Sequence, residues 1–295
     1  MFLNLRIHFF KFHGIGNDYI IINLAENKIN NISWEFKSNL AKKLCKRHYS
    51  IGADGILFAI PPELDDYHYK MEIFNPDGSE AEMCGNGIRM FAKYLYTKNL
   101  VKSLKQKILT KAGLVLPEII IENNNINGIK VNMGIPKLLR SEIPMIGPEG
   151  RVINEDLIIN GEKFKITCVN MGNPHCVIFI EDIENLDINI GKKIEYHEVF
   201  PNRINVEFVN IINRNEIRVK VWERGVGKTL ACGTGACASV VAGVLNSKIN
   251  RNVLVHLDGG DLKIHWADTD EVFMIGSAEE IFEGYIEVDF ESLIE

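Results

Sequence analysis

A short motif that occurs twice, at half-chain spacing, constrains this sequence more than any other feature. Cys84-Gly-Asn-Gly and Cys232-Gly-Thr-Gly lie 148 positions apart in a chain of 295 residues, and a mostly apolar segment follows each. One such motif could be any tight turn. Two at this spacing indicate an internal duplication of about half the chain. The period is far longer than the roughly 20–50 residues of a solenoid repeat, so the duplicated unit has the size of a lobe. We therefore expect two similar halves, each with a thiol just before a helix.

Polar residues upstream extend the duplication. Asn75 stands nine positions before the first motif's cysteine, and Glu223 stands nine before the second. A Gly-Asn pair also occurs in each half, at Gly16-Asn17 and at Gly172-Asn173. The repeat therefore includes candidate ligand-binding residues as well as the cysteines.

The distribution of apolar residues predicts a mixed α/β (α+β) fold with many short strands and few helices. Helices are expected at Trp34–Arg47, Gly87–Lys98 and Gly235–Asn246, and the small residues of the last predict close burial inside a sheet. Strands are expected in the first half at Leu5–Phe12, Tyr19–Asn23, Gly55–Ile60, Tyr67–Phe74, Lys107–Thr110, Val115–Ile121 and Ile129–Met133. In the second half they are expected at Phe164–Asn170, His175–Phe179, Asn205–Asn210, Glu216–Trp222, Asn252–His256, Asp261–Trp266 and Glu271–Glu279.

The segment Glu122–Gly128, rich in asparagine, reads as a turn and as a domain boundary. We expect an N-terminal lobe of residues 1–128 that carries Cys84 and is joined by a C-terminal strand at 282–295. The C-terminal lobe, residues 129–281, would carry Cys232.

Charge and hydropathy exclude several classes of partner. The net charge is −6, which argues against nucleic acid, because a phosphate-binding surface needs a positive field. No apolar run approaches the roughly 20 residues of a membrane span. The N-terminal stretch is interrupted by Arg6, His8 and Lys11 and lacks the features of a signal peptide, so a cytoplasmic location is expected.

The six cysteines show no zinc-binding spacing, and a chain of this size needs no disulfides to fold, so we predict no metal site. All six are expected to be reduced. Four of them, Cys45, Cys168, Cys176 and Cys237, are expected to be buried packing residues.

A cysteine placed where the chain turns into a helix has a distinct chemistry. The glycines that follow permit close approach of a ligand, and the first N–H groups of a helix bind anions. The helix dipole is expected to lower the thiol pKa from about 8.5 toward neutrality. Each motif thus predicts a thiol that exchanges a proton near pH 7, beside a cradle for a carboxylate.

Two such units suit the inversion of a carbon stereocentre. One thiolate removes a proton from one face of the carbon, and one thiol delivers a proton to the other. N–H donors around the substrate carboxylate would stabilise the charge that develops. The further candidate contacts to a polar amino acid are Asn17, Asn75, Asn173, His175, Asn205, Glu223 and Arg224. Taken singly, each asparagine is typical of a turn or a cap.

The sequence also resembles a known family, diaminopimelate epimerase. The resemblance rests on FHGIGNDY, NPDGSEAEMCGNGIR, MGNPHCV, RINVEF and ERGVGKTLACGTGACA, which occur in order from Lys11 to the C-terminal region. It implies two similar α/β lobes, each with a mixed sheet wrapped around a central helix. It also implies a cytoplasmic homodimer that interconverts LL- and meso-2,6-diaminopimelate for lysine biosynthesis without a cofactor.

The resemblance assigns roles residue by residue. It implies that Cys84 and Cys232 are the catalytic thiols, and that His175 and Glu223 tune them. It implies carboxylate cradles at Gly85-Asn86 and Gly233-Thr234. The implied substrate contacts are Asn17, Asn75, Asn173, Asn205, Glu223 and Arg224. One position departs from the pattern, since Gly55 stands where a substrate-contacting glutamine is often found.

Three alternatives are left open by the residues. A proline or hydroxyproline racemase shares the paired cysteines, although a histidine would be more typical of it at Asn86. A thiol switch would form a disulfide between Cys84 and Cys232. A binding module without enzymatic activity would have no need for two thiols.

Overall fold

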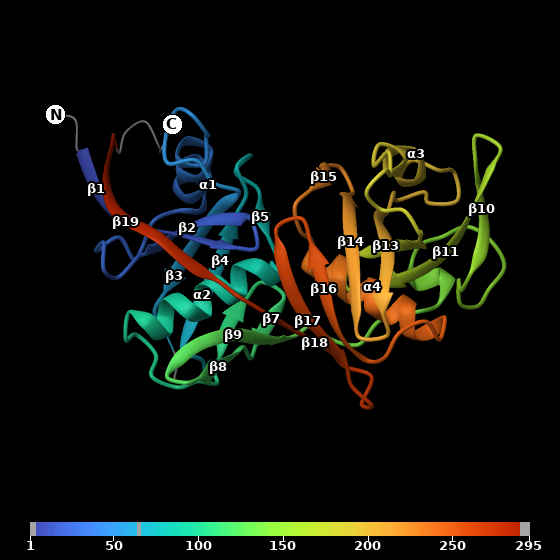
Figure 1. Cartoon of the computed structure of the whole chain (residues 1–295). Helices are drawn as coiled ribbons and strands as arrows, with labels where there is room; N and C mark the ends of the chain where they lie inside the picture. The colour runs from blue at the N-terminus through green and yellow to red at the C-terminus, as the bar shows by residue number, and fades with distance from the viewer. Residues whose placement is uncertain (1–3, 64–65, 290–295) are drawn as a thin grey trace. The chain divides into compact units, whose positions relative to one another are not determined.

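The computed structural model describes residues 4–63 and 66–289, and the chain divides into two compact units (Figure 1). The first unit runs through Val131 and resumes at Ser277, and the second is Asn132–Gly276. Among the residues described, no helix is long and apolar enough to cross a membrane.

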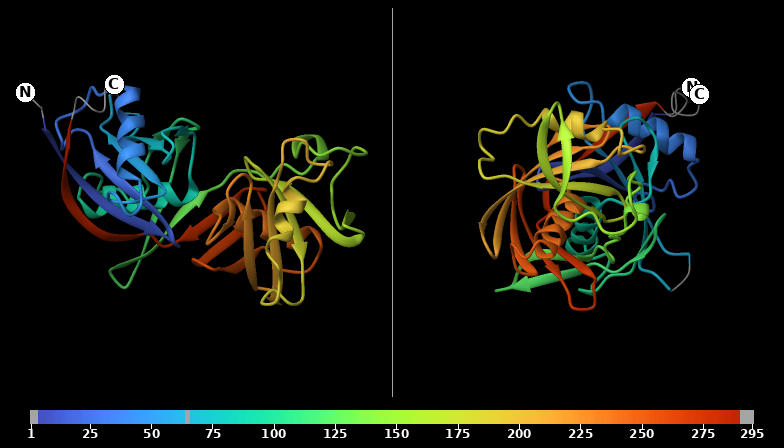
Figure 2. Two further views of the ribbon diagram at one scale, coloured as in Figure 1. Left: turned by 90° about the horizontal axis from the view of Figure 1, so that it is seen from above. Right: turned by 90° about the vertical axis from the view of Figure 1, so that its right-hand side faces the viewer.

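The sheet of the first unit has the strand order β19-β1-β2-β3-β4-β6-β7. Its pairs β2–β3 and β4–β6 are parallel and its other pairs are antiparallel. Strands β1 and β19 run side by side along their length in both Figures 1 and 2. The strands are β1 (Asn4–Gly14), β2 (Asn17–Asn23), β3 (Gly55–Ile60), β4 (Tyr69–Phe74), β6 (Ile108–Thr110), β7 (Gly113–Val115) and β19 (Glu279–Asp289). The remaining elements are β5 (Glu80–Ala81), β8 (Glu118–Glu122), β9 (Asn125–Asn132) and the helices α1 (Trp34–Leu44) and α2 (Gly85–Thr97).

The sheet of the second unit has the order β10-β11-β12-β13-β14-β16-β17-β18. Its pairs β12–β13 and β14–β16 are parallel, and the others are antiparallel. The strands are β10 (Glu155–Ile159), β11 (Glu162–Asn170), β12 (Pro174–Phe179), β13 (Asn205–Asn213), β14 (Glu216–Glu223), β16 (Asn252–Leu257), β17 (Gly260–Trp266) and β18 (Val272–Gly276). The others are β15 (Gly227–Thr229), η1 (Arg140–Glu142), α3 (Ile190–Glu195) and α4 (Gly233–Leu245).

The two sheets repeat one topology, which confirms the duplication predicted from the paired motifs. The run β1-β2-β3-β4-β6-β7 has the same order and the same parallel and antiparallel pairs as β11-β12-β13-β14-β16-β17. The short strand β5 pairs with β4 just before α2, and β15 pairs with β14 just before α4. Each cysteine motif therefore begins the helix at the same point of its half.

Each of these helices is enclosed by its own sheet. Helix α2 contacts β1, β2, β3 and β19, and α4 contacts strands from β11 to β18, so each sheet curls around its helix. Almost every residue of α4 from Gly233 to Gly243 is buried. Its small side chains let the strands approach closely, as the composition predicted. The predicted mixed sheets wrapped around central helices are confirmed.

Several predicted boundaries are wrong for local reasons. The strand predicted at Val115–Ile121 is broken at Pro117, which lacks the N–H that a strand interior needs. The strand predicted at Glu271–Glu279 stops at Gly276, because the carbonyls of Ser277 and Ala278 accept hydrogen bonds from side chains of α2 instead. Of the predicted C-terminal strand, residues 282–289 lie in β19 and the rest lie outside the described residues.

The turn predicted at Glu122–Gly128 is shorter than expected, since β9 already begins at Asn125. Asn123 and Asn124 form the tight turn and both adopt positive φ. Asparagine tolerates that conformation, which explains the run of asparagines there.

Candidate active site

Cys84 is the N-cap residue of α2. Its backbone is extended, with φ −142° and ψ 116°, and its sulfur accepts a hydrogen bond from the Gly87 N–H at 3.3 Å. The side chain is partly exposed. Gly85 and Asn86 begin the helix, so their backbone N–H groups have no partner within it.

Cys232 is the N-cap residue of α4 in nearly the same conformation. Its φ is −130° and its ψ is 116°, and its sulfur accepts from the Gly235 N–H at 3.4 Å. The Thr234 hydroxyl lies 3.3 Å from the same sulfur. Cys232 is more deeply buried than Cys84, with 7% of its surface exposed. The two thiols thus have one local geometry in two different environments.

Asn17 and Tyr19, which begin β2, lie beside Cys84. The Tyr19 hydroxyl donates to the Cys84 sulfur at 3.5 Å, and the sulfur lies 3.9 Å from Asn17 Oδ1. Asn86 donates to the same Asn17 oxygen at 3.4 Å, and its own Oδ1 accepts from Arg89 at 2.8 Å. Arg89 is fully buried and also donates to the carbonyls of Gly85 and Ser277. A predicted contact, Asn86, is therefore held by a buried cation.

A network of charged side chains fixes the position of Asn17. The Asn17 amide donates to Asp54 at 2.7 Å, and Arg47 donates to both Asp54 and Asp18. Lys11 lies 2.6 Å from Asp18. Burial raises the pKa of Asp18, but hydrogen bonds from Arg47 and Lys11 outweigh it and lower that pKa below its ordinary value. Asp18 therefore stays ionised and fixes the start of β2.

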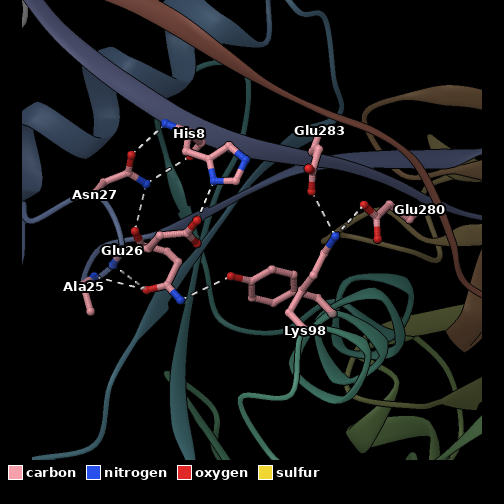
Figure 3. Close-up of polar contacts among 9 residues, drawn as sticks. His8, Ala25, Glu26, Asn27, Lys98, Glu280 and Glu283 are labelled. Carbon is pink, nitrogen blue, oxygen red and sulfur yellow. Dashed lines mark hydrogen bonds and ion pairs between the residues drawn. The ribbon is translucent and has the colours of Figure 1, made fainter.

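The far end of α2 is tied to the sheet by polar contacts. Lys98 donates to Glu280 and Glu283 of β19, as Figure 3 shows. The buried Tyr94 hydroxyl accepts from Asn23 at 3.2 Å. Figure 3 also shows the loop after β2, where Asn27 pairs with the backbone of His8 in β1. These contacts anchor the helix that begins at Cys84.

His175 and Glu207 form a buried pair beside α4. His175 Nδ1 lies 2.7 Å from Glu207 Oε1, its Nε2 lies 2.9 Å from Asn173 Oδ1, and neither side chain of the pair is exposed. Glu207 also borders the helix start, because a Cβ on Gly235 would lie 2.6 Å from its Oε1. The predicted residues Asn173 and His175 thus belong to one chain of contacts.

The environment of Cys232 contradicts one prediction. Burial raises the pKa of the Cys232 thiol well above its ordinary value, and the nearby carboxylates of Glu223 and Glu207 raise it further. Hydrogen bonds from Thr234 and the Gly235 N–H oppose this shift but are smaller. The predicted lowering toward neutrality is wrong here, because desolvation of the thiolate exceeds the effect of the helix start.

Asn205, Glu223 and Arg224 lie where β13 begins and β14 ends. The Asn205 side chain is buried, donates to the Pro174 carbonyl at 2.8 Å and accepts from the Arg224 N–H at 2.9 Å. It therefore bridges the loop of Asn173 to the Glu223-Arg224 turn. The Arg224 side chain donates to the Asn202 carbonyl at 3.2 Å.

Asn75 lies in the turn after β4. Its amide donates to the Ser79 hydroxyl at 3.0 Å, and its backbone pairs with Ser79 and Gly78. The turn leads directly into β5 and then to Cys84.

Sequence reasoning missed four residues that contact the thiols or support the predicted site residues. Tyr19 and Glu207 lie within the motifs named above, but both are strand residues, and the polar candidates were mostly residues of turns and strand ends. Arg89 is a buried cation inside a helix. Glu195 is buried, and its carboxylate accepts from Trp222 and from the Gly225 N–H, so it fixes the Glu223-Arg224 turn. Only their tertiary contacts distinguish them.

The remaining cysteines are buried free thiols, as predicted for packing residues. Burial raises the pKa of Cys45 to about 12. Cys168 and Cys176 lie opposite each other in β11 and β12, and burial raises the pKa of Cys176 well above its ordinary value. Cys84 and Cys232 are also free.

Comparison of folds shows the same architecture in solved structures of low sequence identity. A Bacillus anthracis phenazine biosynthesis protein of the PhzF family matches with a TM-score of 0.69 at 14% identity, covering 96% of this chain and 99% of that one. A probable proline racemase from Agrobacterium radiobacter matches with a TM-score of 0.66 at 13% identity, covering 96% and 93%. These similarities establish the fold alone.

Comparison of sequences is more specific. The profile of the family described as diaminopimelate epimerase matches residues 9–139 and 167–281. The diaminopimelate epimerase of Pelotomaculum thermopropionicum is 50% identical over 279 residues, which cover 94% of this chain and 98% of that one. The diaminopimelate epimerase of Methanocaldococcus jannaschii is 46% identical over 294 residues, covering 94% and 97%. This chain, with its paired cysteine-capped helices, therefore belongs to the diaminopimelate epimerase family.

Proposed function

We propose that this protein interconverts LL- and meso-2,6-diaminopimelate in lysine biosynthesis, with Cys84 and Cys232 as the two bases. The observation that carries the mechanism is that each cysteine caps the central helix of one half in the same geometry. Family membership supports the isomerase activity and the substrate, because the relatives at 44–50% identity are diaminopimelate epimerases.

The proposed reaction moves one proton in each direction at the α-carbon. A thiolate takes the α-proton from one face, and the electron pair of the broken C–H bond is delocalised into the α-carboxylate. The opposite thiol then delivers its proton to the other face. One sulfur ends as a thiol and the other as a thiolate, so no cofactor is needed for the balance. The N–H groups at Gly85-Asn86 and Gly233-Thr234 would stabilise the carboxylate as its charge grows.

The electrostatics favour one arrangement of protons in the free protein. Burial and the carboxylates of Glu223 and Glu207 raise the pKa of Cys232, which keeps it as the thiol. Cys84 receives hydrogen bonds from the Gly87 N–H and the Tyr19 hydroxyl. Because the proposed reaction needs one thiol and one thiolate, we assign the role of proton donor to Cys232 and the role of base to Cys84. After turnover, exchange with solvent restores this distribution.

We propose substrate contacts from the predicted residues of each half. In the first half they are Asn17, Asn75 and Asn86, with Gly85 at the helix start. In the second half they are Asn173, Glu223 and Arg224, with Gly233 and Thr234. We assign Asn205 mainly to the bridge between two loops, because both ends of its amide are already bonded to backbone.

A second copy of the chain is the proposed partner, and the cytoplasm is the proposed location. Strand β19 lies at the edge of the described part of its sheet and exposes Ile281, Phe282 and Tyr285. Such a strand favours pairing with another surface. Six free thiols favour a reducing compartment. Light scattering of the wild type and of Phe282→Glu tests the dimer.

The decisive experiment is exchange in heavy water with LL-diaminopimelate. The wild type should build deuterium into the α-carbon and form the meso isomer. Cys84→Ser and Cys232→Ser should each lose at least about 10²-fold in epimerisation rate. Cys237→Ala, which removes a buried thiol of the same helix as Cys232, is the matched control and should retain activity. Turnover of L-proline without turnover of diaminopimelate would contradict the proposal.

A further inference from the structure

Tyr19 contacts a sulfur that the proposed reaction uses. Its hydroxyl donates to Cys84 Sγ at 3.5 Å, and only 5% of its surface is exposed. The contact joins β2 to the first turn of α2, since the same sulfur accepts from the Gly87 N–H. The hydroxyl of this buried phenol therefore lies where it can affect the proton transfer of the thiol.

Gly55 explains why the ring lies where it does. Tyr19 and Gly55 are direct partners in the parallel β2–β3 pair. A Cβ on Gly55 would lie 2.6 Å from Tyr19 Cε1 and 2.7 Å from the Phe74 carbonyl oxygen. No side chain fits at position 55 without displacing the ring. The glycine thus leaves room for the ring that carries the hydroxyl to Cys84.

The second half places a different polar side chain at the matching point. His175 is the direct partner of Asn205 in the parallel β12–β13 pair, as Tyr19 is of Gly55 in β2–β3. Each stands two positions after the asparagine of a Gly-Asn pair. The family resemblance implies that His175 is one of the groups that tune the thiols. Tyr19 is its topological counterpart in the Cys84 half.

We propose that Tyr19 is a positioning residue that holds the Cys84 sulfur and stabilises its thiolate through the phenolic hydrogen bond. The inference rests on the proposed function, in which Cys84 works as a thiolate. A hydrogen bond donated to the charged form of an acid favours that form. The hydroxyl remains the donor, because burial, and then the charge of Cys84, raise the pKa of Tyr19 well above its ordinary value.

With this role for Tyr19, the two thiols differ in which protonation state their neighbours favour. Cys232 has the carboxylates of Glu223 and Glu207 in its neighbourhood, which favour its protonated form. Cys84 has a phenol donor, which favours its thiolate. A two-base epimerase needs one thiol and one thiolate at the start of each turnover, and these two environments supply that difference.

Tyr19→Phe tests the proposal, because it removes the hydroxyl and keeps the ring over Gly55. The pH dependence of Cys84 alkylation by iodoacetamide is measured in the Cys232→Ser background, without substrate. We expect the midpoint of the alkylation curve to move to higher pH by about one unit. In the otherwise wild-type chain, kcat/KM near pH 7 should fall about 10-fold or more and recover as the pH rises. Unchanged profiles would overturn the proposal.

Tyr94→Phe is the matched control. It removes a hydroxyl from another buried tyrosine, whose partner is Asn23 rather than a thiol, so neither profile should move. If Tyr19→Phe fails to fold, 3-fluorotyrosine at position 19 replaces it, since this residue keeps the shape and donates more strongly. The alkylation curve should then move to lower pH, and no movement would also overturn the proposal. Failure of the proposed function itself would appear instead as absent heavy-water exchange in the wild type.

Discussion

The imidazole of His175 lies 2.7 Å from the carboxylate of Glu207, and neither side chain reaches the surface. The second carboxylate oxygen, Oε2, has no hydrogen-bond partner among the described residues. Burying a polar group costs free energy unless it is hydrogen-bonded, so the contact with the histidine compensates for burying the Glu207 carboxyl group. The pair stands beside the first turn of α4 and therefore influences the Cys232 thiol.

Glu207→Gln is expected to make the Cys232 thiolate easier to form. The substitution keeps the shape of the side chain and removes a negative charge that raises the pKa of Cys232. In a Cys84→Ser background, alkylation of Cys232 at fixed pH should accelerate about threefold or more. Glu184→Gln, which neutralises an exposed carboxylate of the same unit, is the control. Equal acceleration in both variants would show that the charge of Glu207 has no specific effect on the Cys232 thiol.

Gly235→Ala is expected to be more damaging than Gly87→Ala, although the two glycines occupy equivalent positions of the repeat. A Cβ on Gly235 would lie 2.6 Å from Glu207, whereas one on Gly87 would come no closer than 3.3 Å to the Cys84 side chain. Overpacking should cost Gly235→Ala about 1–3 kcal/mol of unfolding free energy. At Gly87 the helix preference for alanine should offset most of the strain. Urea denaturation of both variants measures the difference, and equal stabilities would count against it.

Gly55→Gln introduces the glutamine that the family resemblance leads us to expect at this position. We predict that it lowers stability and activity. The new Cβ would collide with the Tyr19 ring and the Phe74 carbonyl, which is backbone and cannot rotate away. We expect a loss of about 1–3 kcal/mol in unfolding free energy, together with lower activity. Thermal unfolding and the epimerase assay measure both. A variant as stable and active as the wild type would show that the ring can move.

Asn205→Ala should reduce stability and catalysis together. It leaves the Pro174 carbonyl and the Arg224 N–H without their partner, at a cost of about 1–3 kcal/mol. Asn205→Asp keeps an acceptor for Arg224 and loses only the donor to Pro174, so its stability should be intermediate. Chemical denaturation and kcat/KM are measured on both. A pure substrate contact would instead lower kcat/KM with no change in stability.

His256 should titrate above the ordinary pKa of 6.5. Its ring lies 2.8 Å from Glu216 on one side and 2.8 Å from Asp261 on the other, and the hydrogen bond to Glu216 is the largest cause of the raised pKa. A raised pKa stabilises the fold fully below the unfolded value of about 6.5, and this stabilisation is lost as the pH rises through the folded pKa.

NMR titration of the His256 ring measures this pKa directly. The difference in melting temperature between the wild type and His256→Gln should be largest at low pH and shrink as the pH rises. A ring that titrates at or below 6.5 would contradict the ion-pair arrangement between β14, β16 and β17.

Local sequence determined the positions of the two cysteine caps and the fold class. Glycines one and three positions after each cysteine, followed by apolar residues, sufficed to predict a thiol at a helix start, because capping and helix formation depend on neighbours in the chain. The repeat then predicted two similar halves, and the topology of β1–β7 and β11–β17 confirms it. Motifs of this length also sufficed to identify the family.

The tertiary structure alone decided which polar groups surround each thiol. Cys84 and Cys232 have almost the same motif and the same cap geometry, yet one contacts the Tyr19 phenol and the other lies near the carboxylates of Glu223 and Glu207. Tyr19 and Glu207 come from strands that do not adjoin the cysteine motifs in sequence, and desolvation depends on everything packed around a group. For that reason the helix start predicted the wrong direction for the pKa of Cys232. The sequence determined where the thiols stand, and packing decided which polar groups surround each of them.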